Sequence, residues 1–132
     1  MFPNGTVITP DGKTLIIGET YAARLTAFDI NEDATLSNRR IWADFTLNAE
    51  EGSVPVPDGI CLDAEGAIWV ASPTTASVIR VKEGGEILDR IQVETNAYAC
   101  MLGGEDLKTL FICTSNASGV DPEAAVKEKS GK

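Results

Sequence analysis

Short runs of hydrophobic residues recur along the chain, separated by turn-forming residues, and they predict a protein made of β-strands. Each run has four to eight residues, and no sustained helical period precedes residue 120. Turn signals such as Pro10-Asp11-Gly12 and Glu83-Gly84-Gly85 stand between the runs. The predicted strands are Gly5–Ile8, Thr14–Gly18, Arg24–Asp29, Arg39–Phe45, Gly59–Leu62, Ile68–Ala71, Ser77–Val81, Glu86–Val93, Ala99–Leu102 and Thr109–Cys113.

Three of these runs are hydrophobic at consecutive positions, which predicts strands covered on both faces. They are Leu15–Ile17, Ile68–Ala71 and Leu110–Cys113. A strand covered on one face mixes polar and hydrophobic positions instead, as the segment Ile87–Val93 does. This contrast predicts stacked sheets in which inner strands are buried twice and outer strands once.

A repeat of 53 or 54 residues organises the strands. Pro3-Asn4-Gly5 opens one pass, Pro57-Asp58-Gly59 opens the next, and a third pass begins near Cys100 and stops after two strands. Repeats of roughly 40–50 residues with four strands are typical of the blades of a β-propeller. We therefore predict an all-β partial propeller of about two and a half to three four-stranded blades in residues 1–118, followed by a polar loop or frayed short helix in residues 119–132.

Ten strands are too few to form a closed ring of blades. Propellers close with roughly 4–8 blades, and an open stack exposes two sheet faces and several strand edges. We therefore expect the chain either to be a piece of a longer one or to complete its ring with another copy, as a homodimer.

Charge and composition narrow the chemistry. With 20 acidic and 11 basic residues among 132, the chain has a net charge of −9, so it repels nucleic acid and is compatible with divalent cations. It has no histidine, which excludes a Ser-His-Asp triad and a histidine zinc site within one chain. Any chemistry must come from carboxylates, amides, hydroxyls, thiols or a hard metal ion.

Three cysteines, Cys61, Cys100 and Cys113, each lie in a hydrophobic run, and no two of them have a CxxC spacing. An odd and sparse set argues against a disulfide framework, so we predict buried, reduced thiols. The first residues lack the basic and hydrophobic segments of a signal peptide, and no hydrophobic run approaches the ~20 residues of a membrane helix. We expect a cytoplasmic protein that does not bind membranes.

Asn4 and Asp58 hold equivalent positions in the first two repeats, each between a proline and a glycine at the start of a first strand. First strands line the central channel of a propeller, so both side chains are predicted to point into one cavity. A carboxylate and an amide carbonyl are hard oxygen donors, suited to Ca²⁺, Mg²⁺ or Mn²⁺. Because Asn-Gly and Asp-Gly are also common turn dipeptides, a purely structural role is the alternative.

The segment Pro57–Ala71 closely resembles a signature stretch of the senescence marker protein/gluconolactonase/luciferin-regenerating enzyme family. Pro3-Asn4-Gly5 is similar to a preceding metal-ligand motif of that family, and Ser37–Arg40 and Gly119–Glu123 also look like family segments. The resemblance implies a six-bladed propeller with one divalent metal ion at the mouth of its channel. It also implies a small-molecule substrate, because the family reaction is the hydrolysis of sugar lactones.

By the same resemblance, Asp58 is a metal ligand and the catalytic carboxylate, and Asn4 is a second ligand. The cation is expected to be Ca²⁺, with Zn²⁺, Mn²⁺ and Mg²⁺ as alternatives, and it would polarise the lactone carbonyl and acidify a water. Asp58 would accept the proton of that water as general base. Metal ligation lowers the basicity of a carboxylate, so the two roles of Asp58 compete.

Members of this family are roughly twice as long as this chain. The resemblance places their third metal ligand, a glutamate, and their substrate-orienting arginine and asparagine in the N-terminal half. It therefore implies a lactone hydrolase that is impaired without those residues. The alternative is a non-catalytic propeller module that associates with itself or binds a partner.

Four other polar residues have predicted positions but no predicted catalytic role. Asp63 is predicted to support the turn to Gly66, and Glu19 and Thr20 to form a loop at one rim. Asn96 precedes the third first strand and is a candidate for a further channel-facing side chain.

Both tryptophans are predicted to be packing residues. Trp69 lies in the middle of a hydrophobic run and is expected to pack between blades, and Trp42 is expected to pack on an outer strand.

Overall fold

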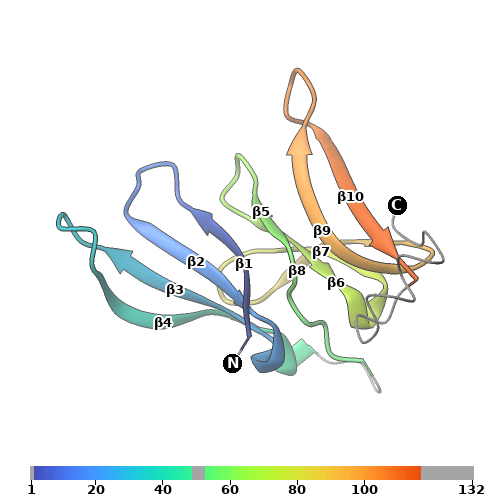
Figure 1. Ribbon diagram of the computed structural model, residues 1–132, viewed down its shortest axis with the longest axis horizontal. Helices are drawn as coiled ribbons and strands as arrows, with labels where there is room; N and C mark the ends of the chain where they lie inside the picture. Colours follow the sequence, from blue (N-terminus) through green and yellow to red (C-terminus); the bar gives the residue numbers. More distant parts are fainter. Residues whose placement is uncertain (1, 49–52, 117–132) are drawn as a thin grey trace, which may run out of the picture.

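The computed structural model describes residues 2–48 and 53–116, and ten strands form three antiparallel sheets in these residues (Figure 1). Blade 1 contains β1 (Pro3–Ile8), β2 (Thr14–Glu19), β3 (Arg24–Ile30) and β4 (Leu36–Asp44). Blade 2 contains β5 (Ile60–Leu62), β6 (Ile68–Ser72), β7 (Ser77–Val81) and β8 (Ile87–Gln92), and the third sheet contains β9 (Asn96–Gly103) and β10 (Thr109–Ser115). The ten predicted strands and the predicted all-β class are thus confirmed.

The first strands of the three sheets lie next to one another, with β5 between β1 and β9. The backbone N–H of Gly5 donates to the carbonyl of Asp58 at 2.9 Å, and the N–H of Gly59 donates to the carbonyl of Tyr98 at 2.9 Å. From these inner strands the sheets run outward in chain order and stack face to face. This is the blade arrangement of a β-propeller, with two four-stranded blades and two strands of a third.

The two blades repeat the same turn between their second and third strands. A short 3₁₀ helix, η1 (Thr20–Ala22) or η3 (Pro73–Thr75), ends in an alanine with a left-handed backbone. These alanines are Ala23 and Ala76, with φ of 46° and 45°. Their carbonyls accept the N–H of Phe45 and Val93 respectively, so the fourth strand of each blade is attached at the same point.

Two hydrophobic clusters hold the sheets together. The first lies between blades 1 and 2, and its buried side chains include Ile16, Leu25, Trp42, Phe45, Ile68, Val70 and Ile79. The second lies between blade 2 and the third sheet, contains Cys61, Ala71, Val78, Ala97 and Cys100, and has Trp69 packed against it. The packing roles predicted for both tryptophans are confirmed.

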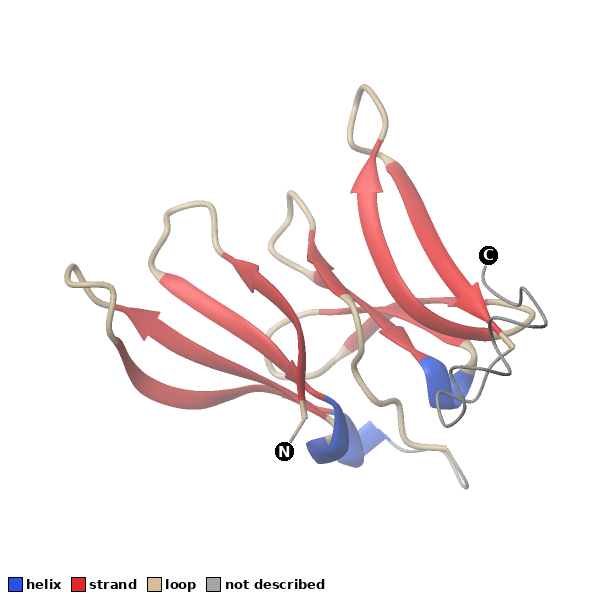
Figure 2. Ribbon diagram, viewed as in Figure 1, coloured by secondary structure: helices blue, strands red, loops and turns tan. Residues whose placement is uncertain are grey.

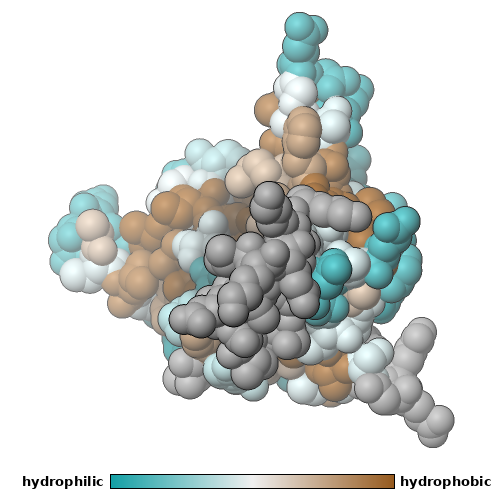
Figure 3. All heavy atoms as spheres, turned by 45° about the vertical axis from the view of Figure 1, so that its right-hand side comes forward, coloured by the Kyte–Doolittle hydropathy of each residue, from teal (hydrophilic) through white to brown (hydrophobic). Residues whose placement is uncertain are grey.

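The third sheet is covered on one face only by the described residues. Met101 and Phe111 are paired across β9 and β10 and are 60% and 58% exposed. Cys113 lies on the same face two residues after Phe111 and is exposed, so the prediction that it is buried is wrong. Figure 3 shows hydrophobic surface along this hairpin below a hydrophilic tip. Among the described residues, nothing provides the second covering layer that the pattern of Leu110–Cys113 predicts.

The predicted C-terminal loop or helix, residues 119–132, lies outside the described residues. Within the described residues the only helices are η1, η3 and η2 (Phe45–Asn48), and none has the length and hydrophobicity needed to cross a membrane.

Candidate functional site

Asn4 and Asp58, which the repeat predicted to converge, are in contact. Asn4 is the second residue of β1, and Asp58 lies just before β5. The side-chain amide of Asn4 donates a hydrogen bond to the Asp58 carboxylate. β1 begins at the end of the sheets that carries the 3₁₀ helices, opposite the hairpin loops (Figure 2). The structure therefore brings one amide and one carboxylate together from neighbouring blades.

The glycines that follow Asn4 and Asp58 allow the inner strands to approach closely. A Cβ on Gly5 would lie 2.5 Å from the carbonyl oxygen of Asp58 and 2.5 Å from the nitrogen of Ile60. A Cβ on Gly59 would lie 2.8 Å from the Cα of Ala99. Neither glycine has a positive φ, so the dipeptides are not turns of the kind that require glycine. The glycines instead set the spacing that puts Asn4 next to Asp58.

The backbone around Asp58 is fixed by hydrogen bonds from both neighbouring elements. The N–H of Asp58 donates to the carbonyl of Ala71 at 3.0 Å, and the N–H of Ala71 donates to the carbonyl of Gly59 at 2.9 Å. The hydroxyl of Thr20, at the start of η1, donates to the carbonyl of Pro57 at 2.8 Å. The position of the carboxylate is therefore determined by blade 1 as well as by blade 2.

Burial raises the pKa of the Asp58 carboxyl above its ordinary value of 3.8. The hydrogen bonds from the Asn4 side chain and from the Gly59 backbone favour the ionised form and oppose this rise without cancelling it. A raised pKa makes the ionised carboxylate a better proton acceptor near neutral pH.

The third sheet supplies a residue at the equivalent position that the sequence did not indicate. The carbonyl of Tyr98 accepts the Gly59 N–H just as the carbonyl of Asp58 accepts the Gly5 N–H, so Tyr98 corresponds to Asp58. Asn96 lies two residues earlier, and its amide donates to the Tyr98 hydroxyl at 3.5 Å. The third repeat has Tyr98-Ala99 in place of an acid or amide followed by glycine, which removes the signal that revealed the first two.

The oxygen atoms of Asp58 and Asn4 are of the type that binds hard divalent cations such as Ca²⁺. The Asp58 carboxylate and the Asn4 amide supply oxygen atoms at one place, and both side chains are partly exposed. The described part of the chain contains no group of three Asp, Glu, Cys or His residues placed to bind a metal ion. Since Ca²⁺ takes roughly 6–8 oxygen ligands, water, substrate or further residues must complete its shell.

Asp63 has the structural role predicted for it. Its carboxylate accepts the backbone N–H groups of Glu65 at 2.9 Å and Ala67 at 3.0 Å, which fixes the turn at Gly66, and it accepts the Nε of Arg80 at 2.7 Å. Burial raises the pKa of Asp63, but the hydrogen bonds from Arg80 and the backbone outweigh it, so the pKa is lowered. This carboxylate is fully occupied in holding blade 2.

Glu19 differs from the prediction of a rim loop. It is the last residue of β2 and is only 8% exposed. Its carboxylate accepts the Nε of Arg24 at 2.5 Å, the hydroxyl of Thr26 at 2.6 Å and the Nη2 of Arg39 at 3.3 Å. Thr20 begins η1, so the loop starts one residue later than predicted.

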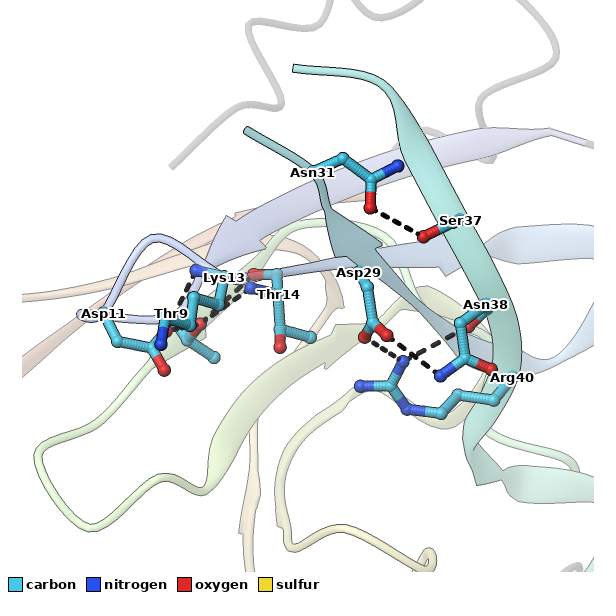
Figure 4. Close-up of polar contacts among 9 residues, drawn as sticks. All are labelled: Thr9, Asp11, Lys13, Thr14, Asp29, Asn31, Ser37, Asn38 and Arg40. Carbon is cyan, nitrogen blue, oxygen red and sulfur yellow. Dashed lines mark hydrogen bonds and ion pairs between the residues drawn. The ribbon is translucent and has the colours of Figure 1, made fainter. Parts of the chain in front are cut away.

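A depression of about 740 Å³ lies away from Asn4 and Asp58, between the hairpin ends of blade 1. Its polar side chains bond locally, as Figure 4 shows: Asp11 accepts the hydroxyl of Thr9 at 2.6 Å, and Asp29 accepts Arg40 at 2.6 Å and Asn38 at 2.9 Å. The carboxylates of Asp11 and Asp29 are thus engaged within the hairpins that form the depression.

Two blades and part of a third, with an amide and a carboxylate joined at their inner strands, define a propeller protein with a small polar cluster on its first strands. The chain belongs to the SMP-30/gluconolactonase/LRE-like family, whose profile matches residues 1–116. The neighbouring folds are six-bladed propellers, so the chain corresponds to part of one.

Three relatives illustrate the match. A 6-deoxy-6-sulfogluconolactonase of Pseudomonas putida is 31% identical over 99% of this chain and 44% of its own length. The regucalcin of Danio rerio is 32% identical over 95% of this chain and 41% of its own length. The crystal structure of a calcium-binding protein, regucalcin, from Agrobacterium tumefaciens superposes with a TM-score of 0.74 at 25% identity, over 97% of this chain and 42% of that one. The chain therefore spans less than half the length of the relatives it matches.

Proposed function

We propose that this chain carries part of the site of a divalent-cation-dependent hydrolase of sugar lactones. The observation that supports this most directly is the contact between Asn4 and Asp58 in a chain of the gluconolactonase family. The name of the Pseudomonas putida relative supports a sugar lactone as the substrate class, and the names of the regucalcin relatives support Ca²⁺ as the cation.

Asp58 and Asn4 would hold the cation through their carboxylate and amide oxygens. The cation, when bound, supplies a Lewis acid for the lactone carbonyl and for water. Asp58 would accept a proton from the attacking water; burial, which raises the pKa of this carboxyl, favours that transfer, and ligation of the cation opposes it. Asn4 orients the carboxylate by its hydrogen bond, while the close contact of β1 with β5 keeps the two side chains together.

We expect slow hydrolysis from this chain by itself. Two protein ligands are few for Ca²⁺, so both affinity and the positioning of a lactone should be weak.

Cation binding is the direct test. Calorimetric titration with Ca²⁺, Zn²⁺ and Mn²⁺ should show binding that Asp58→Asn abolishes and Asn4→Ala weakens. Asp63→Asn is the matched control, because it removes a carboxylate of the same blade that is engaged with Arg80 and the backbone. Titration of δ-gluconolactone hydrolysis with base should show the same order of variants. Binding or turnover that survives Asp58→Asn unchanged would contradict the proposal.

A second candidate function, self-association, is favoured by the exposed face of the third sheet. Met101 and Phe111 present large hydrophobic side chains to solvent there, and two copies of this chain together approach the length of one relative. Light scattering after size exclusion should then show a dimer that Phe111→Ser converts to monomer. A wild-type chain that is monomeric at high concentration would exclude this candidate.

A further inference from the structure

Two of the three cysteines lie in the same buried cluster at the boundary between blade 2 and the third sheet. Cys61 lies in β5 and Cys100 in β9, and they are 3% and 5% exposed. The Sγ of Cys100 lies 3.5 Å from the carbonyl oxygen of Trp69, which is the cross-strand partner of Cys61, and 3.7 Å from that of Gly59. The Cys100 side chain is thus directed at the strand that carries Cys61.

The backbones at this place are unusually close. A Cβ on Gly59 would come within 2.8 Å of the Cα of Ala99 and 3.0 Å of the carbonyl oxygen of Tyr98. A disulfide requires Cα atoms about 4.4–6.8 Å apart and Cβ atoms directed towards each other. The tight contact of Gly59 with Ala99, two residues before Cys61 and one before Cys100, brings the strands that carry the two cysteines close together.

The two thiols already interact with one another. The hydrogen bond from Cys100 lowers the pKa of the Cys61 thiol, against the effect of burial, and the Leu102 N–H helps. The same hydrogen bond and burial raise the pKa of the Cys100 thiol. Cys61 therefore loses its proton first, and Cys100 stays protonated beside it.

We propose that Cys61 and Cys100 are an oxidation site, which a small hydroperoxide converts to an intramolecular disulfide and which a dithiol reduces again. A small oxidant is specified because both sulfurs are almost completely buried. This assignment is independent of the lactone hydrolysis proposed above.

The reaction balances in two steps. The Cys61 thiolate attacks one peroxide oxygen, the O–O bond breaks, and the products are Cys61 sulfenic acid and an alcohol, or water when the oxidant is hydrogen peroxide. The Cys100 sulfur then attacks the Cys61 sulfur, its proton leaves with the hydroxide as water, and the S–S bond forms. Two thiols lose two electrons, and one peroxide bond gains them.

The disulfide would tie β5 to β9 directly beside the site. The carbonyl oxygen of Gly59 lies 3.7 Å from the Cys100 Sγ, and Gly59 follows Asp58 in the chain. The covalent link would therefore fix the strand that follows the candidate carboxylate. Oxidation would therefore prevent blade 2 and the third sheet from separating.

The experiment uses the full chain with Cys113→Ser, which removes the exposed thiol able to link two molecules. Folded protein is treated with hydrogen peroxide and free thiols are then blocked. Non-reducing peptide mapping should show Cys61 joined to Cys100, in a monomer two hydrogen atoms lighter, and dithiothreitol should reverse both changes. The link should form at least ten times faster than in the same chain unfolded in urea.

Two variants act as matched controls in the same background. Cys61→Ala and Cys100→Ala each retain one buried thiol and should give no intramolecular link. Cys61 in the Cys100→Ala chain should take up oxygen instead, because it is the thiol that attacks the peroxide. The Cys113→Ser chain keeps both Cys61 and Cys100, so misfolding of either alanine variant cannot hide the result of the mapping. The proposal is overturned if Cys61 and Cys100 remain free thiols, if they link only between molecules, or if they join only after unfolding.

Discussion

Blades 1 and 2 have the same backbone turn after their second strand but satisfy its buried polar position in different ways. In blade 1 the position is Glu19, whose carboxylate is bound by Arg24, Thr26 and Arg39. In blade 2 it is Ser72, whose hydroxyl accepts the N–H of Val56 at 3.2 Å and the hydroxyl of Thr75 at 2.7 Å.

The two blades carry different polar residues at this position because their faces are covered differently. Blade 2 lies between blade 1 and the third sheet, so Ser72 is completely buried and a neutral hydroxyl with local partners suffices. The face of blade 1 that carries Glu19 is not packed against another sheet of the described residues, and arginine side chains cover it. A charge is tolerated where cations and water are near, and a hydroxyl is used where they are not.

The largest expected effect concerns the inner strands, where the two blades are alike. Gly5→Ala and Gly59→Ala each place a Cβ within 3 Å of backbone atoms, so each should lower the free energy of unfolding by about 3 kcal/mol or more. Gly18→Ala is the matched control, because its Cβ meets the Pro57 side chain at 3.2 Å and should cost much less. Urea denaturation measures all three. Equal stability of Gly5→Ala and Gly18→Ala would show that the strands are not held this closely.

Substitutions at the buried polar position, Glu19 in blade 1 and Ser72 in blade 2, should affect stability differently. Glu19→Gln removes a carboxylate bonded to two arginines and should cost about 2 kcal/mol, since hydrogen bonds to charged groups are the stronger ones. Ser72→Ala leaves the Val56 N–H without its acceptor and should cost about 1 kcal/mol. Denaturation midpoints show which variant loses more stability. A larger loss for Ser72→Ala than for Glu19→Gln would contradict the explanation that the covering of each blade determines its polar residue.

The pH dependence sharpens the same contrast. Burial raises the pKa of Glu19, but the hydrogen bonds from Arg24 and Thr26 and the nearby arginine charges outweigh it, so the pKa lies below 4.5. The stabilisation is therefore fully present above the unfolded-state value of 4.5 and disappears as the pH falls through the lower folded-state pKa. The stability difference between wild type and Glu19→Gln should shrink on acidification, whereas that for Ser72→Ala should stay constant.

The smallest effect is expected at Asp58, which joins the two blades. Its raised pKa means that ionisation costs stability as the pH rises above 3.8. Because the side chain is partly exposed, solvent screening reduces this to a few tenths of a kcal/mol, so Asp58→Asn should be slightly more stable than wild type at neutral pH. Matching thermal scans at pH 7 and pH 3 measure the gain and its loss. A clearly destabilised Asp58→Asn would instead give Asp58 a structural role.

The strands and the pairing of Asn4 with Asp58 were predictable because both depend on repetition. Hydrophobic runs and turn residues recur, and two equivalent motifs 54 residues apart must occupy equivalent places in neighbouring blades. The structural role of Asp63 was predictable from the adjacent turn signal.

Residues whose surroundings depend on distant parts of the chain were not predictable. Cys113 lies in a run that indicates two covering layers, but the described residues provide one. Glu19 carries a charge and follows a strand, which suggests solvent, although its arginine partners come from the third and fourth strands. Tyr98 matches neither motif residue, and only the backbone bond to Gly59 reveals its position.

The glycine contacts between the inner strands limit the ways in which the specificity of such a site can change. With Gly5 against Asp58 and Gly59 against Ala99, the three strands have no room to shift relative to one another. New specificity must therefore arise by exchanging what projects from fixed attachment points, at Asn4, Asp58 and Tyr98, because the frame beneath them does not adapt.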